Sequence, residues 1–161
     1  MVSGGPAFSV PIEDRCFEDY VPGSKYEFGS VRVDERRMIE FAEEFDPQSF
    51  HVDAEAAATG PFGGLIASGW HTTALMMRLF ADHYLSKTAS LGGPGVDELR
   101  WLAPVRPGDV LGLRVTVLET RRSGAKPDRG LVRTLAEMVN QDDVVVLRLT
   151  VLNFLRTRSS L

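Results

Sequence analysis

The stretch "GWHTTALMMRLFADHYLS", residues 69–86, decides the fold of this chain. Its large apolar side chains are spread around nearly the whole circumference of the helix that the sequence predicts here: Leu75, Met76, Met77, Leu79 and Phe80. A helix that is apolar all round is buried on most sides, whereas a surface helix buries a single stripe. We therefore expect a long buried helix at about 69–86 that the rest of the chain encloses.

After residue 95 the hydrophobic pattern changes to the alternation that is typical of β-strands. Residues 111–117 alternate leucine or valine with polar or small side chains, and further strands are predicted at 131–139 and 144–155. A buried helix followed by antiparallel strands predicts an α+β fold in which the sheet wraps around the helix. Such a sheet has exposed edges, and pairing two of them predicts a homodimer or a higher homo-oligomer.

The segments before this helix are predicted to frame it. Residues 25–33 indicate a strand with a possible bulge at Gly29, after which Asp34 begins a helix. Residues 1–24 contain glycine, proline and scattered charges, which is typical of an N-terminal arm that wraps a domain. A chain of 161 residues is long enough to bury one core, so we expect residues 1–161 to form a single domain.

Composition argues against several kinds of partner and compartment. The formal net charge of −4 argues against a nucleic-acid-binding surface, which usually carries a basic excess. No run of roughly 18 apolar residues is present, so we expect no membrane partner, and the N-terminal sequence does not resemble a secretory signal. The single cysteine, Cys16, cannot form an internal disulfide and fits a reducing cytoplasm. A cytoplasmic protein is therefore the expectation.

The segment "FDPQSFHVD", residues 45–53, brings an acid and an imidazole close together. Pro47 disfavours helical geometry at Asp46, so the segment is predicted to turn, and in a turn Asp46 and His51 can converge on one point. A histidine can take or give a proton near neutral pH, and a nearby carboxylate can orient it. Three interpretations stay open on spacing alone: a structural turn, part of a metal site, or a general acid/base pair.

A metal site is not predicted. Besides carboxylates, the chain offers only His51, His71 and His83 as ligands, without a cysteine pair or an HExxH motif. Zinc needs three or four ligands held close together. The two histidines of the long helix are more typical of buried structural residues than of ligands.

The segment "GPFGGLIASGWHT", residues 60–72, places a cluster of glycines directly before the long helix. It matches neither a dinucleotide-binding loop nor a nucleophile elbow. The backbone N–H groups at the start of a helix can hold an anion or a developing oxyanion, which makes Gly63, Gly64, Ser68 and Gly69 candidate substrate-binding residues. The alternative is that the glycines only permit a tight turn. The aromatic residues nearby are candidates for lining a pocket: Phe45, Phe50, Phe62 and Trp70.

Taken together, these residues resemble one family. The run "FAEEFDPQSFHVDAEAAATGPFGGLIASGWHTTALMMRL" (41–79) is similar to the signature stretch of the MaoC-like acyl dehydratases, which include the (R)-specific enoyl-CoA hydratases. The similarity continues in "FEDYVPGSKYEFGSVRV" (17–33), "GVDELRWLAPVRPGDVL" (95–111) and "AKPDRG" (125–130), and it covers about residues 16–156. This resemblance implies the hotdog fold, an antiparallel sheet wrapped around a long helix.

The resemblance also implies roles for particular residues. In these hydratases an aspartate and a histidine five residues apart activate water, and Asp46 and His51 match that spacing. A backbone N–H near the glycine turn holds the thioester oxygen, and the dimers place acyl-CoA at the subunit interface. The family pattern D-x-N-P-x-H departs from "DPQSFH", and anchoring on the proline leaves Glu44 as an alternative carboxylate. Ser68 stands where many members have histidine.

The resemblance therefore predicts a hydratase/dehydratase that acts on a 2-enoyl or 3-hydroxyacyl-CoA thioester. Neither a metal nor another cofactor is implied, because the thioester carbonyl is itself the electron sink. Two alternatives stay open on the sequence: an acyl-CoA thioesterase of the same fold, and a non-catalytic acyl-CoA-binding subunit. The acyl chain, and the choice between CoA and an acyl carrier protein, also stay open.

Overall fold

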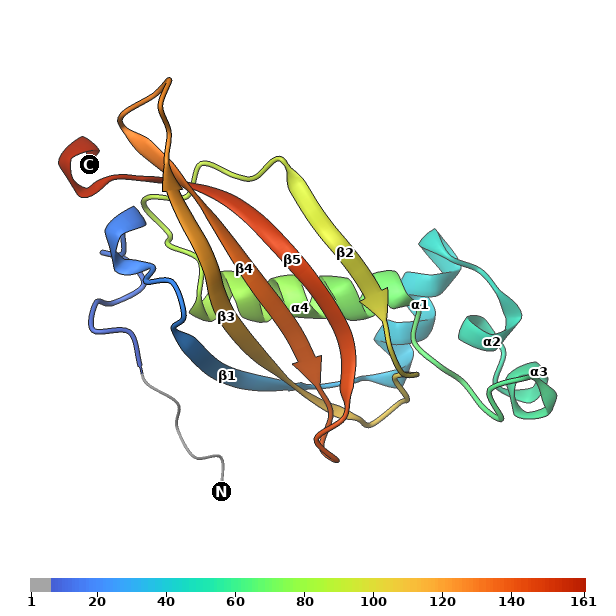
Figure 1. The fold of residues 1–161 in the computed structure, drawn as a ribbon. Helices are drawn as coiled ribbons and strands as arrows, with labels where there is room; N and C mark the ends of the chain where they lie inside the picture. Colours follow the sequence, from blue (N-terminus) through green and yellow to red (C-terminus); the bar gives the residue numbers. More distant parts are fainter. Residues whose placement is uncertain (1–6) are drawn as a thin grey trace.

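The computed structural model describes residues 7–161 and contains one curved antiparallel sheet (Figure 1). Its five strands are β1 (Lys25–Arg32), β2 (Gly95–Trp101), β3 (Val110–Arg122), β4 (Arg129–Val139) and β5 (Val145–Arg156). The spatial order is β1-β3-β4-β5-β2, so the last three strands of the chain form a meander with β1 and β2 at its two edges. The register of β1 against β3 shifts between Phe28 and Val31, which confirms the bulge predicted at Gly29.

Helix α4 (Gly69–His83) runs across one face of this sheet (Figure 1). Alternate side chains of the strands point toward it, and the largest fully buried ones include Leu111, Leu113, Val115, Met138 and Leu149. From the helix, Met76, Leu79 and Phe80 enter the same core. The α+β fold with a sheet wrapped around one long helix, which is the hotdog arrangement, is thus confirmed.

Two details of the predicted helix are wrong. It ends at His83 rather than at residue 86, because the N–H groups of Tyr84 and Leu85 both bond the Phe80 carbonyl and close the last turn. It is also not buried on most sides, since the sheet covers only one of its faces. In the single chain Trp70 and Met77 stay exposed on the opposite face.

Three further helices precede α4: α1 (Glu35–Phe45), α2 (Ser49–Val52) and α3 (Ala54–Thr59). Asp34 caps α1 by accepting a hydrogen bond from the Arg37 N–H, as the sequence predicted. Asp53 caps α3 in the same way, through the N–H groups of residues 55 and 56. In Figure 1 these helices lie beyond the end of the sheet where α4 begins, and they supply the acid and the imidazole of the site.

The described part of the N-terminal arm, residues 7–24, packs onto the other end of α4. It contains the short 3-10 helix η1 (Phe17–Asp19), and a second one, η2 (Arg158–Ser160), ends the chain. The aromatic rings of Phe8 and Tyr26 stack at 4.1 Å, and the Arg15 guanidinium lies 3.8 Å from the Phe8 ring centre. The first six residues of the predicted arm lie outside the described range.

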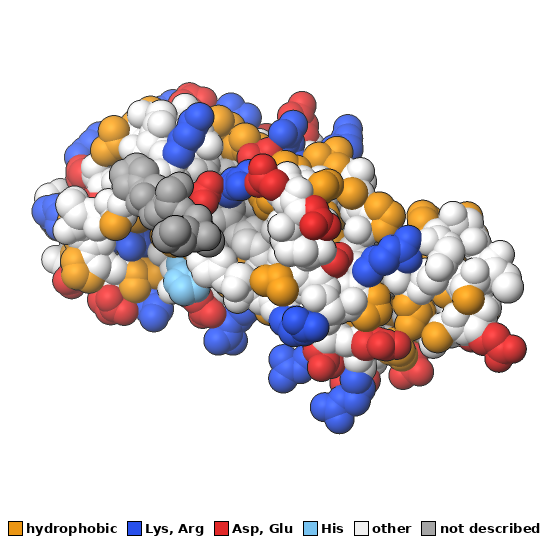
Figure 2. Space-filling model, turned by 90° about the horizontal axis from the view of Figure 1, so that it is seen from below, with side chains coloured by type: hydrophobic (Ala, Val, Ile, Leu, Met, Phe, Trp, Pro, Cys, Tyr) orange, Lys and Arg blue, Asp and Glu red, His pale blue; other side chains and the backbone are white. Residues whose placement is uncertain are grey.

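Within residues 7–161, none of the helices is both long and apolar enough to cross a bilayer. On the face seen in Figure 2, acidic and basic side chains are interspersed.

Candidate active site

The acid and the imidazole lie on two helices separated by a sharp turn. Asp46 ends α1, where its backbone (φ −154°, ψ 63°) leaves the helical region, as expected for a residue that precedes proline. The short helix α2 begins two residues after Pro47 and carries His51, which is only 5% exposed. The turn brings His51 Nε2 to 3.3 Å from Asp46 Oδ2. Asp46 and His51, five residues apart, are thus in contact because the chain leaves the helix between them.

His51 is held in one orientation and one tautomer. Its Nδ1 lies 2.8 Å from the backbone carbonyl of Ile66. A carbonyl oxygen only accepts, so Nδ1 carries a hydrogen and donates it. In the neutral imidazole the lone pair is therefore on Nε2, which faces the Asp46 carboxylate.

The Asp46 carboxylate is fixed through both of its oxygens. The Ser68 hydroxyl donates to Oδ2 at 2.7 Å, and the Gln48 side-chain amide donates to Oδ1 at 2.7 Å. Burial by itself raises the pKa of Asp46, but the hydrogen bonds from Gln48 and Ser68 and the positive charge that His51 carries when it is protonated more than offset it. The pKa of Asp46 therefore lies below its ordinary value, and the group is a carboxylate at neutral pH.

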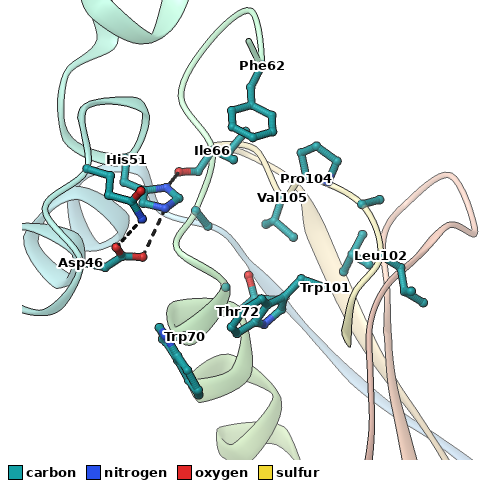
Figure 3. Close-up of a pocket in the computed structure, with 15 residues that line it drawn as sticks. Asp46, His51, Phe62, Ile66, Trp70, Thr72, Trp101, Leu102, Pro104 and Val105 are labelled. Carbon is teal, nitrogen blue, oxygen red and sulfur yellow. Dashed lines mark hydrogen bonds and ion pairs between the residues drawn. The ribbon is translucent and has the colours of Figure 1, made fainter. Parts of the chain in front are cut away.

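A cavity of about 450 Å³ opens beside this pair (Figure 3). Figure 3 shows Asp46 and His51 on one side of it and mostly apolar side chains on the other. The residues that line it are Asp46, Gln48, His51, Phe62, Ile66, Ala67, Gly69, Trp70, Thr72, Trp101, Leu102, Ala103, Pro104, Val105 and Val146. A volume of this size with a few convergent polar groups is typical of a small-molecule site.

The start of α4 forms part of the cavity wall. Ser68 is the N-cap residue of α4, and its hydroxyl accepts a hydrogen bond from the Trp70 N–H while it donates to Asp46. Gly69, the first residue of the helix, lines the cavity. The N–H groups of a first helical turn have no partner within the helix. A ligand oxygen in the cavity therefore meets the positive end of the α4 dipole.

The structure brings some of the other sequence-predicted residues to the cavity and leaves others away from it. Phe62 and Trp70 line it. Phe45 does not: it is 63% exposed and packs against Phe41 of the same helix. Phe50 does not either, because it supports His51 and Phe62 from behind, with ring centres at 4.5 and 5.3 Å.

The candidate glycines before α4 also differ in whether they line the cavity. Gly63 and Gly64 do not line the cavity, and both have positive φ (65° and 152°), so they serve the turn, the alternative that the sequence left open. Only Gly69 reaches the cavity. Ser68, a candidate for substrate binding, instead donates its hydrogen to Asp46. The alternative carboxylate, Glu44, is exposed on α1, whereas Asp46 is the one in contact with His51.

Sequence reasoning missed the far wall of the cavity, residues 101–105. It begins at Trp101, the last residue of β2, and continues into the loop that follows the strand. A tryptophan at a strand end and a proline three residues later, Pro104, are weak signals of a binding wall. Their role depends on the packing of β2 against α4, which one sequence does not display.

The other two histidines do not take part in the pair. His71 is buried beside Phe41, with ring centres 5.2 Å apart, and burial lowers its pKa. His83 stacks on Phe28 at the far end of α4. Across residues 7–161, histidine, cysteine and carboxylate side chains do not come together in a group of three that would suit a metal ion.

Comparison with known proteins identifies the family. The model of the MaoC like domain matches residues 18–151 of this chain, which is most of its length. The chain belongs to the MaoC-like dehydratase family. Its match therefore spans the Asp46–His51 turn, α4 and the cavity wall after β2.

Solved structures agree with this assignment. The MaoC-like dehydratase from Rhodospirillum rubrum is 39% identical, superposes with a TM-score of 0.80, and the match covers 89% of this chain and 97% of that one. The (R)-hydratase PhaJ1 from Pseudomonas aeruginosa is 27% identical with a TM-score of 0.71, and the match covers 88% of this chain and 86% of that one. Both are similar to this MaoC-like domain over nearly its whole length.

A third relative is similar over a shorter stretch. The 3-hydroxyacyl-thioester dehydratase Z of Mycobacterium tuberculosis is 45% identical over 64 residues, which is 39% of this chain and 42% of that protein. The matched stretch therefore covers less than half of either protein.

Proposed function

We propose that this MaoC-like domain adds water to a 2-enoyl thioester and removes it from the corresponding 3-hydroxyacyl thioester, with acyl-CoA as the substrate. One observation carries the proposal: the contact of 3.3 Å between Asp46 Oδ2 and His51 Nε2 at the wall of an apolar cavity. The names of relatives, a 3-hydroxyacyl-thioester dehydratase and an (R)-hydratase, support the same reaction class.

In this proposal Asp46 and His51 hold the reacting water. The lone pair of His51 Nε2 accepts one hydrogen of the water, and the carboxylate of Asp46 accepts the other. Nδ1 donates to Ile66 throughout, which keeps Nε2 free for proton transfer. The hydrogen bonds from Ser68 and Gln48 keep the carboxylate in place.

In the addition, the water oxygen bonds to the β-carbon and the π electrons move to the thioester oxygen. The enolate that forms is stabilised by the Gly69 N–H at the start of α4. One proton of the water passes to the His51–Asp46 pair, and a proton returns from the pair to the α-carbon, so the product is the neutral 3-hydroxyacyl thioester. Dehydration is the same path in reverse.

The test is hydration of crotonyl-CoA by the purified protein, followed by loss of the enoyl thioester absorbance with free thiol measured in parallel. Asp46→Asn and His51→Ala should each lower kcat/KM by about two to four decades, since each removes a proton-transfer partner. Glu44→Gln is the matched control, because it removes the exposed carboxylate two residues away and should leave the rate unchanged. Release of free thiol instead of hydration would contradict the proposal and indicate a thioesterase. Binding without any turnover of a range of enoyl-CoAs would indicate a non-catalytic subunit.

A further inference from the structure

The indole ring of Trp101 bridges the end of β2 and the start of α4. A Cβ atom added to Gly69 would lie 2.3 Å from Cε2 of this ring, so the ring rests directly on the glycine backbone. The Trp101 Nε1–H donates to Thr73 Oγ1 at 3.2 Å, and the Thr73 hydroxyl donates in turn to the Gly69 carbonyl at 2.8 Å. The ring is therefore held across the first turn of α4 by contact and by a hydrogen bond.

A second indole ring supports the first. Trp70 meets Trp101 edge to face, with ring centres 5.1 Å apart and an interplanar angle of 80°. Both side chains line the cavity that contains Asp46 and His51. In Figure 3 they lie at one end of the cavity, by the first turn of α4, and Phe62 lies at the other. Edge-to-face aromatic pairs favour a defined geometry. The two side chains are 56% and 46% exposed, so they separate this end of the cavity from solvent.

We infer that Trp101 is a specificity-determining residue that limits the length of the acyl group and makes short enoyl thioesters the preferred substrates. In this inference the end of the acyl chain meets the ring, so a longer chain would have to displace it. This inference rests on the proposed function for its substrate, and on the Gly69 and Thr73 contacts for its geometry. Apolar pockets discriminate by about 10- to 200-fold for a single methylene group, so one ring can decide chain length.

The first experiment compares kcat/KM for octenoyl-CoA and crotonyl-CoA. Trp101→Ala should raise the octenoyl-to-crotonyl ratio by about 10-fold or more, which is the lower end of the discrimination that apolar pockets achieve. Thr73→Val keeps the shape of the side chain but removes the acceptor for the indole N–H, and it should shift the ratio in the same direction by less. Trp101→Phe keeps a ring in place and should preserve the preference. An active Trp101→Ala variant with an unchanged ratio would overturn the inference.

A second readout does not depend on the reaction. Trp70 and Trp101 are the two tryptophans of the chain, and both line the cavity, so tryptophan emission reports ligand binding there. Butyryl-CoA and octanoyl-CoA carry no double bond to hydrate, and their Kd ratio should move toward octanoyl-CoA in Trp101→Ala. If Trp101→Ala does not fold, Thr73→Val is used for both measurements, the kcat/KM ratio and the Kd ratio.

The two readouts separate the inference from the proposed function. A protein that hydrates no enoyl thioester but shows the shift in Kd ratio would contradict the proposed function and still support the role of Trp101. A protein that hydrates crotonyl-CoA while the variants leave both ratios unchanged would overturn the role of Trp101 alone.

Discussion

At the residue scale, the hydroxyl of Ser68 links the carboxylate of the site to the helix that forms its wall. It donates to Asp46 Oδ2 and accepts from the Trp70 N–H, and the side chain is fully buried. A buried hydroxyl that both donates one hydrogen bond and accepts another is restricted to one orientation. The position of Asp46 relative to the start of α4 is therefore set by Ser68.

Replacing Ser68 with alanine tests this link. The hydrogen bond from Ser68 is one of the causes that lower the pKa of Asp46, so Ser68→Ala should raise that pKa. The acid limb of the kcat/KM–pH profile for crotonyl-CoA should then move to higher pH, with a loss in rate of about one to two decades. Ser30→Ala, at an exposed serine on β1, is the control. An acid limb that stays in place would show that Ser68 does not hold the carboxylate.

The same pKa shift has a consequence for stability. Because the pKa of Asp46 is lower in the folded chain than in the unfolded chain, ionised Asp46 stabilises the fold above the ordinary carboxyl pKa. This contribution is lost as the pH falls through the folded-state value. In Ser68→Ala the folded pKa moves toward the unfolded one, so less of this stabilisation remains at neutral pH.

The sequence was informative about residues that are close together along the chain. Asp46 and His51 were selected from their spacing and from Pro47 between them, and they are in contact. Ser68 was given a different role because its partner lies 22 residues away. Phe45 was expected at the cavity because it adjoins Asp46, but the last turn of α1 points it to solvent. Such contacts depend on how helices pack, which the order of residues does not display.

At the scale of elements, α4 is fixed at both ends by polar contacts. Ser68 caps its start, and at its end the buried Arg15 donates to the carbonyls of His83 and Tyr84 at 2.7 and 3.0 Å. The last carbonyls of a helix have no partner within the helix, and a cation there also meets the negative end of the dipole. The N-terminal arm, through Arg15, therefore supplies hydrogen-bond donors to the C-terminal end of α4.

Arg15→Met should therefore destabilise the fold. Methionine keeps most of the length of the side chain but leaves the His83 carbonyl without its partner and the Tyr84 carbonyl with Tyr20 alone. This predicts a loss of about 1 to 3 kcal/mol in the free energy of unfolding. Arg78→Ala is the matched control, because Arg78 lies on the same helix but pairs with Asp82 at the surface. Chemical denaturation measures both variants. Equal losses would show that the arm does not hold this end of α4.

The predicted elements were confirmed where a periodic pattern was present, as in β3, β4 and β5. The end of α4 was predicted three residues too late, since apolar residues continue to Leu85 and the pattern contains no stop signal. At this end Arg15 donates to the carbonyls of His83 and Tyr84, and the Tyr20 hydroxyl donates to the Tyr84 carbonyl. The partners of this helix end lie more than 60 residues away in sequence.

At the scale of the whole molecule, both sheet edges, β1 and β2, and one face of α4 have no partner within the described residues. β2 pairs with β5 on one side only, and it lies at the edge of the sheet. Val96 and Trp101 on this strand and Met77 on α4 are exposed in the single chain. An exposed edge strand that carries apolar side chains favours pairing with another strand. These features support the homodimer that the sequence predicted.

We expect the dimer to form through β2, and one pair of variants tests this. Val96 on β2 is 47% exposed and Leu118 on β3 is 45% exposed, so lysine at either position changes charge and exposure to a similar extent. Lysine on an edge strand opposes strand pairing. Val96→Lys should therefore weaken dimerisation by about tenfold or more in sedimentation equilibrium, equivalent to about 1.4 kcal/mol, and Leu118→Lys should not. If Leu118→Lys separates the subunits instead, the contact lies on the outer face of the sheet. A wild-type monomer at all concentrations would rule out the dimer altogether.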